Sequence, residues 1–154
     1  METMTSTGRD IVLSRYDPSY DGDIMILCQL FVKESLGEYG ISVSHDRFTQ
    51  MIELCKESSF FLVDGERPVG VIAGIVVNSL TDGRPALQEV IWYVNPMYRR
   101  HGHRLLRAFE ILAKNVGVKT VVMASMCNSM HERVDRIYKK LGYTPFEVQY
   151  IKEI

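Results

Sequence analysis

Three strand-like segments joined by two tight turns lie in the middle of the chain, and they constrain the fold more than any other feature. Ser59–Val63, Val69–Val77 and Ala86–Val94 are rich in β-branched and aromatic residues, which favour strands. The turns between them, residues 64–68 and 81–85, each contain an Asp-Gly pair and end in proline. Because turns this short join antiparallel neighbours, the three segments predict an antiparallel sheet.

A strand–helix–strand unit follows. A polar loop, Met97–His103, leads into a helix that Gly117 ends and that carries four apolar residues on one face: Leu105, Phe109, Leu112 and Val116. Thr120–Met126 then reads as a buried strand. This order implies a parallel crossover, so one parallel unit is expected in the sheet.

The two ends of the chain supply the remaining elements. Ile11–Tyr16 and Phe146–Ile151 predict a first and a last strand. Apolar residues at helical spacing predict two helices, near residues 24–31 and 48–55, and another helix over Glu132–Leu141. The whole order predicts a mixed α/β, α+β-like fold. Its central sheet is largely antiparallel with one parallel β-α-β unit, and helices pack on both faces.

The length of 154 residues suits one domain, and no Pro/Gly/Ser-rich linker divides the chain. We therefore expect a single domain over residues 9–154. The polar N-terminus, residues 1–8, is expected to be disordered.

The net charge of −1, from 18 Lys+Arg and 19 Asp+Glu, gives no overall basic bias toward nucleic acid. Cys28, Cys55 and Cys127 are widely spaced and form no CxxC pair, so neither a disulfide framework nor a metal site is expected. No apolar run approaches the about 18 residues that span a bilayer, and the N-terminus lacks the apolar core of a signal peptide. These features predict a cytoplasmic protein with no membrane partner.

The junction between the third strand and the following helix is the strongest functional signal. A helix N-terminus offers unpaired backbone N–H groups and a partial positive charge, and a glycine in front of it lets the backbone approach a phosphate. Arg99, Arg100 and Arg104 add positive charge at this point, and Gly102 supplies the glycine. The junction predicts a phosphate or pyrophosphate site; the alternative is a solvated basic loop before an ordinary helix.

This junction resembles the acetyl-CoA-binding motif of the GNAT superfamily of N-acetyltransferases, Arg/Gln-x-x-Gly-x-Gly/Ala. Arg99 and Gly102 match the motif, and the element order from Ile11 to Ile151 agrees with that fold. The resemblance implies acetyl-CoA as cofactor. It implies binding by two groups of residues: the strand residues Trp92, Tyr93 and Val94, and the turn residues Arg99, Arg100, His101, Gly102, His103, Arg104 and Leu105.

Arg104 departs from the motif, which has glycine or alanine at this position. Its side chain either points outward while its backbone N–H serves the site, or pairs with a phosphate, or crowds the cofactor.

Glu89 is the candidate general base. Strand alternation places it on one face with Leu87, Ile91 and Tyr93, where burial would raise its pKa toward neutrality, as a base requires. The resemblance implies the same role for Glu89, and a bulged strand nearby. The alternative is a structural ion pair with a nearby arginine or lysine, for example Arg84.

Tyr138 matches the tyrosine of the family's Tyr-x-Lys-x-Gly-Phe ending, which the resemblance makes the proton donor to the departing thiolate. The alternative is a core aromatic on the apolar stripe of its helix. Seven residues earlier the family has a cofactor-contacting asparagine, where this chain has His131, with Asn128 close by in the sequence.

These features predict an N-acetyltransferase that moves an acetyl group from acetyl-CoA to a primary amine by direct attack. Two other functions stay open: a non-catalytic acyl-CoA-binding or regulatory domain on the same fold, and a nucleic-acid-associated module using the basic stretch from Arg99. The partner is an amine-bearing acceptor, a small molecule or a macromolecule, and similar proteins make a homodimer plausible.

Overall fold

The computed structural model describes residues 10–127 and 130–154, so the N-terminal residues 1–8, expected to be disordered, lie outside the described residues. A five-stranded sheet has the order β1-β2-β3-β4-β5. Its strands are β1 (Ile11–Ser14), β2 (Ser59–Asp64), β3 (Arg67–Asn78), β4 (Pro85–Val94) and β5 (Val121–Val122). The first four strands pair antiparallel, and β4 pairs with β5 in parallel. The predicted mixed sheet is therefore confirmed.

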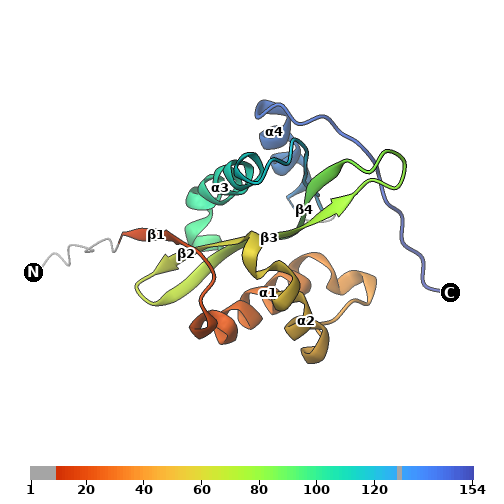
Figure 1. Ribbon diagram of the computed structural model, residues 1–154. Helices are drawn as coiled ribbons and strands as arrows, with labels where there is room; N and C mark the ends of the chain where they lie inside the picture. The colour runs from red at the N-terminus through yellow and green to blue at the C-terminus, as the bar shows by residue number, and fades with distance from the viewer. Residues whose placement is uncertain (1–9, 128–129) are drawn as a thin grey trace, which may run out of the picture.

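Helices cover both faces of this sheet (Figure 1). One face carries α1 (Asp21–Ser35) and α2 (His45–Cys55), and the other carries α3 (Gly102–Asn115) and α4 (His131–Lys140). In the described part of the chain, four short 3-10 helices lie between the main elements: η1 (Pro18–Tyr20), η2 (Gly37–Tyr39), η3 (Lys56–Ser58) and η4 (Pro96–His101).

Each face of the sheet has its own apolar core. Phe48 of α2 and Phe61 of β2 belong to the core under α1 and α2, and Phe109 of α3 belongs to the core under α3 and α4. Phe109 is completely buried and lies against Gly74 of β3, where an added Cβ would collide with the Phe109 ring and with the Gln88 carbonyl. Only glycine fits at this point, so β3, β4 and α3 can pack closely there.

A β-bulge in β4 changes which residues share a face. Ala73 pairs with Ile91, whereas the next residue, Gly74, pairs with Glu89, so Val90 is the extra residue. Leu87 consequently lies in the α3 core, and Ile91 lies in the α1 core. The expected single face shared by Leu87, Glu89, Ile91 and Tyr93 is thus wrong, because strict alternation does not continue through a bulge. The irregular strand that the family resemblance implied is present.

The predicted last strand is also wrong. Residues 146–151 form no strand, and most of their apolar side chains are exposed. The strand expected over 120–126 is reduced to the two paired residues of β5. Residues 146–151, and residues 123–126 beyond β5, have no strand paired with them within the described residues.

Candidate active site

The parallel ladder between β4 and β5 ends after two residue pairs, and the candidate site lies at this end. Leu87 pairs with Val121 and Gln88 with Val122. The next residue, Glu89, is hydrogen-bonded to the backbone of Ala124, whose N–H is the donor to the carboxylate. The Glu89 side chain thus connects the two segments where the backbone pairing stops, and β4 and β5 separate beyond this point.

The same residue, Ala124, also meets the second candidate catalytic side chain. The Tyr138 hydroxyl on α4 donates a hydrogen bond to the Ala124 carbonyl oxygen at 2.8 Å. Glu89 and Tyr138, distant in sequence, therefore converge on one peptide unit. Their mutual influence appears in the pKa of Tyr138, which burial raises above its usual value and which the charge of Glu89 raises further.

Burial raises the pKa of Glu89 to about 8, although the hydrogen bond from Ala124 acts in the opposite direction. A carboxyl group with this pKa exchanges its proton close to neutral pH, which suits a general base. The expected alternative partner, Arg84, lies elsewhere: its Nε is 3.4 Å from Asp82 Oδ2, and both side chains are largely exposed.

Tyr138 has the position of a core aromatic residue and also that of a candidate proton donor, the two roles considered for it. Its ring is buried in the α3 core, with ring centroids 5.9 Å from Trp92 and 5.4 Å from Tyr143. Its hydroxyl nevertheless reaches the end of the β4–β5 ladder through Ala124. Because its pKa is raised, the phenol stays protonated at neutral pH.

The turn between β4 and α3 is wound into the 3-10 helix η4 instead of the open loop expected over Met97–His103. The Asn95 side chain accepts a hydrogen bond from the Met97 N–H at 3.2 Å, and Pro96 occupies the first helical position, which together start the helical turn. The helix α3 follows without a side-chain cap and without an acidic residue in its first turn. This N-terminus keeps its attraction for anions.

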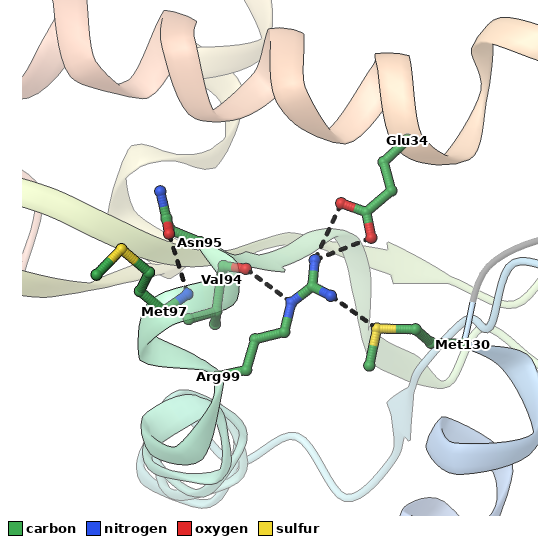
Figure 2. A network of polar contacts seen from close by, with 6 residues as sticks. All are labelled: Glu34, Val94, Asn95, Met97, Arg99 and Met130. Atoms are coloured by element: carbon green, nitrogen blue, oxygen red, sulfur yellow. Dashed lines mark hydrogen bonds and ion pairs between the residues drawn. The ribbon is translucent and has the colours of Figure 1, made fainter.

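Arg99 uses its guanidinium to connect three elements (Figure 2). Its Nε donates to the Val94 carbonyl of β4 at 3.1 Å, and its Nη2 lies 2.9 Å from both carboxylate oxygens of Glu34 on α1. Its Nη1 lies 2.9 Å from the sulfur of Met130, just before α4. The positive charge predicted to attract a phosphate is therefore neutralised by Glu34.

Arg104 also points away from the turn. Its Nη1 donates to the Ile11 carbonyl of β1 at 2.8 Å, so its side chain lies outward, the first of the three arrangements considered. Arg100 differs, because its guanidinium is exposed and makes only a long contact of 3.4 Å to the Met97 carbonyl. Arg100 is thus the one of the three predicted arginines whose charge remains available at the turn.

The other predicted turn residues differ in their exposure. His103 is exposed, with Nδ1 3.1 Å from the Arg100 carbonyl oxygen. Burial and the neighbouring Arg100 and Arg104 lower the pKa of His101, which favours its neutral form. The Leu105 side chain is completely buried, so only its backbone is placed to contact a ligand.

An unpartnered polar atom lies close to this turn. The indole Nε1 of Trp92 is buried and has no hydrogen-bond partner within the described residues. The Trp92 ring also approaches Gly102, where an added Cβ would lie 3.9 Å from Trp92 Cζ2 and 3.5 Å from Val94 Cγ2. An uncapped helix start, a free arginine and an orphaned donor together fit a ligand that carries phosphate and amide groups.

His131 follows Met130, whose sulfur contacts Arg99 of the turn. It begins α4, and its Nδ1 is 2.8 Å from Ser125 Oγ. Asn128, considered as an alternative to His131, lies outside the described residues.

Sequence reasoning missed three residues of this site. Glu34, Ala124 and Met130 contact the predicted residues only through the tertiary fold. Glu34 is one of several polar residues near the end of an apolar helical pattern. Ala124 acts through its backbone. Neither carries a local signal that distinguishes it from its neighbours.

A comparison with family models identifies the class of protein that this fold and site define. Residues 24–143 match the model described as the acetyltransferase (GNAT) family. The chain therefore belongs to the GNAT acetyltransferase family, whose members use acetyl-CoA. No curated protein sequence matches the chain.

Solved structures share the fold at low sequence identity. An acetyltransferase from Trypanosoma brucei is 18% identical, with a TM-score of 0.70 over 94% of this chain and 100% of that one. A ribosomal-protein-alanine N-acetyltransferase from Brucella melitensis biovar Abortus 2308 is 11% identical, with a TM-score of 0.72 over 94% and 99%. AAC(6')-Iy, solved with the bisubstrate analogue CoA-S-monomethyl-acetylneamine, is 14% identical, with a TM-score of 0.70 over 94% and 99%.

Among residues 10–127 and 130–154, no helix combines the length and the apolar character needed to cross a membrane.

Proposed function

We propose that this protein transfers an acetyl group from acetyl-CoA to a primary amine, with Glu89 as general base and Tyr138 as general acid. One observation carries the proposal: a carboxyl group whose pKa is raised to about 8 and a phenol that stays protonated meet at Ala124, where β4 and β5 separate. Acid–base catalysis uses two groups with different pKa values, one that accepts a proton and one that donates it.

The proposed roles follow from these environments. Glu89 takes a proton from the substrate ammonium, directly or through a water molecule, so that the neutral amine carries a free electron pair. When bound, acetyl-CoA supplies an acyl group activated as a thioester. Tyr138 turns its hydroxyl from the Ala124 carbonyl to protonate the departing sulfur. Holding the two reactants together supplies much of the remaining rate enhancement.

The residues proposed to hold acetyl-CoA surround the start of α3. The start of α3, which has no side-chain cap and no acidic residue in its first turn, and the exposed Arg100 suit the phosphates. The buried indole N–H of Trp92 suits an amide carbonyl of the pantetheine arm. The CoA-containing bisubstrate analogue bound to AAC(6')-Iy supports this choice of cofactor.

The acceptor is proposed as a primary amine of unassigned identity. Similar structures include proteins named as an aminoglycoside acetyltransferase and as a ribosomal-protein-alanine N-acetyltransferase. Both kinds of acceptor present an amine that must lose a proton before it attacks, so both are compatible with the proposed role of Glu89.

A thiol-release assay tests the proposal. Acetyl-CoA is incubated with the protein and a panel of amines: a polyamine, an aminoglycoside, free amino acids, and peptides with an N-terminal alanine or an internal lysine. We expect amine-dependent release of CoA and an acetylated product by mass spectrometry. Tight binding of acetyl-CoA without turnover on any of these amines would favour the non-catalytic acyl-CoA-binding alternative instead.

A further inference from the structure

A groove lies between α1 and the sheet, at the point where β3 begins and β4 has ended. Its volume is about 270 Å³, slightly below the range of about 300–1,000 Å³ that is typical of sites for drug-sized ligands. A smaller molecule therefore fits this groove, and its lining indicates which kind.

Apolar side chains make up most of the lining. Leu27 of α1 and Val69 of β3 are almost completely buried, each with 3% of its surface exposed. Ile26 and Leu30 of α1 also line the groove, but they remain 54% and 37% exposed. Because Ile26 and Leu30 are one helical turn apart, they lie side by side on α1. A ligand with an apolar part would cover this strip and remove it from water.

Two groups of opposite charge line the same groove from different elements. Asp23 lies in the first turn of α1 and is half-buried, and Arg67 is the first residue of β3. Within residues 10–127 and 130–154, neither side chain has an ion-pair partner, and the two do not pair with each other. The carboxylate is therefore available to a cationic group of a ligand, and the guanidinium to an anionic group.

Asn95 adds a hydrogen-bond donor at the end of the groove where β4 has ended. Its Oδ1 accepts from the Met97 N–H, whereas its Nδ2 has no hydrogen-bond partner in the described part of the chain (Figure 2). An amide N–H next to an arginine suits a carboxylate, which accepts several hydrogen bonds at once.

We propose that this groove is a binding site for a free amino acid with an apolar side chain. The ammonium group contacts Asp23, the carboxylate accepts hydrogen bonds from Arg67 and Asn95, and the side chain covers Ile26 and Leu30. A carboxylic acid without an amine leaves Asp23 unpaired, and an amine without a carboxylate leaves Arg67 unpaired. Only a ligand with both charges and an apolar part matches the whole lining.

This site is separate from the one proposed for acetyl transfer. Asn95 follows Glu89 by six residues, which corresponds to roughly 15–20 Å at the usual rise of an extended chain. The Glu89 carboxylate is bonded to Ala124 beyond β5, whereas the groove lies between α1 and the start of β3. An amino acid bound here is therefore not the acetyl acceptor, and its binding does not depend on the proposed transfer.

Isothermal titration calorimetry on the full chain tests the proposal with L-leucine, L-methionine and L-phenylalanine. We expect saturable binding of at least one of them. Isocaproate, which is leucine without its amine, and isoamylamine, which is leucine without its carboxylate, should bind about tenfold more weakly than leucine or not at all, because each loses a charge-assisted contact. The proposal is wrong if none of the three amino acids binds, or if either single-charge analogue binds as tightly as leucine.

Charge-neutral variants locate the two contacts. Asp23→Asn and Arg67→Gln should each weaken binding of the tightest amino acid by about tenfold. The matched controls are Asp46→Asn, also in the first turn of a helix, and Arg84→Gln, an exposed arginine that precedes a proline as Arg67 does; both should bind like the wild type. Thermal unfolding checks that all four variants fold, and an unchanged affinity in folded Asp23→Asn or Arg67→Gln would overturn the proposal.

Heteronuclear NMR on the wild type tests the location without any variant. Titration with the same amino acid should shift the backbone signals of Ile26, Leu30 and Asn95 most strongly. If the strongest shifts instead lie at Glu89 and Ala124, the amino acid occupies the acetyl-transfer site and the proposed groove is not its binding site.

Discussion

Glu89 connects the end of a β-ladder to the proposed chemistry. Its carboxyl group stabilises the separated strands through Ala124, and its pKa of about 8 places proton exchange near neutral pH. A folded-state pKa above the usual value of 4.5 means that the native state binds a proton more tightly than the unfolded chain. The resulting contribution to stability is complete below the usual pKa and is lost as the pH rises toward about 8.

Replacing Glu89 with glutamine should lower kcat/KM by about 10²–10⁴. Wild-type kcat/KM should rise with pH through about 8, because the base is active only after deprotonation. The deficit of Glu89→Gln should shrink only above about pH 8, because Glu89 of the wild type is then already deprotonated while the fraction of neutral substrate amine still rises. Steady-state kinetics with the identified acceptor measure both effects.

The control for Glu89→Gln is Glu53→Gln, which changes an exposed carboxylate of α2 paired with Lys56 of η3 and should leave kinetics unchanged. Thermal unfolding checks that Glu89→Gln folds, and its stability should fall less than that of the wild type as pH rises toward about 8. A folded Glu89→Gln protein with full activity at every pH would show that another group is the base.

Replacing Tyr138 with phenylalanine should reduce kcat with little rescue at high pH, because it removes a proton donor instead of a base. The change also removes the hydrogen bond to the Ala124 carbonyl, which should cost about 0.5–1.5 kcal/mol of stability. Tyr143→Phe is the matched control, since it removes the hydroxyl of the neighbouring ring. Equal losses of kcat in both variants would contradict an acid role specific to Tyr138.

At the level of elements, Arg99 matters for how α1 is attached to the sheet. Its bidentate contact with Glu34 crosses from the turn after β4 to the far end of α1. The C-terminal end of α1 is therefore fixed to the turn by a residue whose sequence motif indicates a phosphate site. The sequence predicts the position of Arg99 in the turn, but the partner of its side chain depends on how α1 packs.

A double-mutant cycle of Arg99→Met and Glu34→Gln measures this attachment. Charge-assisted bonds contribute about 1.5–3 kcal/mol, but solvent weakens this pair, because the side chains are 24% and 34% exposed. We expect a coupling free energy of about 1 kcal/mol by chemical denaturation. Acetyl-CoA affinity should change little, since the charge of Arg99 is already neutralised.

The control cycle uses Asp135 and Lys139, an ion pair within α4 at 2.8 Å. Pairs of this spacing contribute about 0.3–0.5 kcal/mol. A coupling for Arg99 and Glu34 no larger than this value would mean that the bridge does not fix α1.

For the whole molecule, the sequence predicts the parts of the fold whose neighbours are close along the chain. The β2–β3 and β3–β4 hairpins follow from their turns, and the parallel unit follows from the strand–helix–strand order. The bulge at Val90 could not be predicted from the residues alone, because it depends on the fit of Gly74 against Phe109 and Gln88. Alternation in residues 146–151 indicates a strand, but these residues form none, because alternation does not supply a strand to pair with.

In the candidate site, too, the residues that belong to local motifs are predictable and their long-range partners are not. The family resemblance indicates Glu89 and Tyr138 as candidates, and the structure brings both to Ala124. The partners of Arg99 and Arg104 were not predictable, because Glu34 and Ile11 lie far away in the sequence. An arginine in a motif thus indicates where a positively charged side chain lies along the chain. Long-range packing determines which residue that side chain contacts.

Ligand binding should stabilise the whole fold if the start of α3 holds acetyl-CoA. Binding to the native state alone adds about 2.7 kcal/mol at a ligand concentration of 100 times Kd, which corresponds to a rise in Tm of several degrees for a chain of this size. Gly102→Val should remove most of this rise, because a Cβ there already contacts Val94 and Trp92, and the valine methyl groups would push α3 away from β4.

Gly102→Ala is the graded control: its Cβ would lie 3.5 Å from Val94 Cγ2, an ordinary contact, so it should keep most of the response. Differential scanning fluorimetry with and without acetyl-CoA measures both variants. If Gly102→Val responds to acetyl-CoA as strongly as the wild type, the cofactor phosphates bind elsewhere on the molecule.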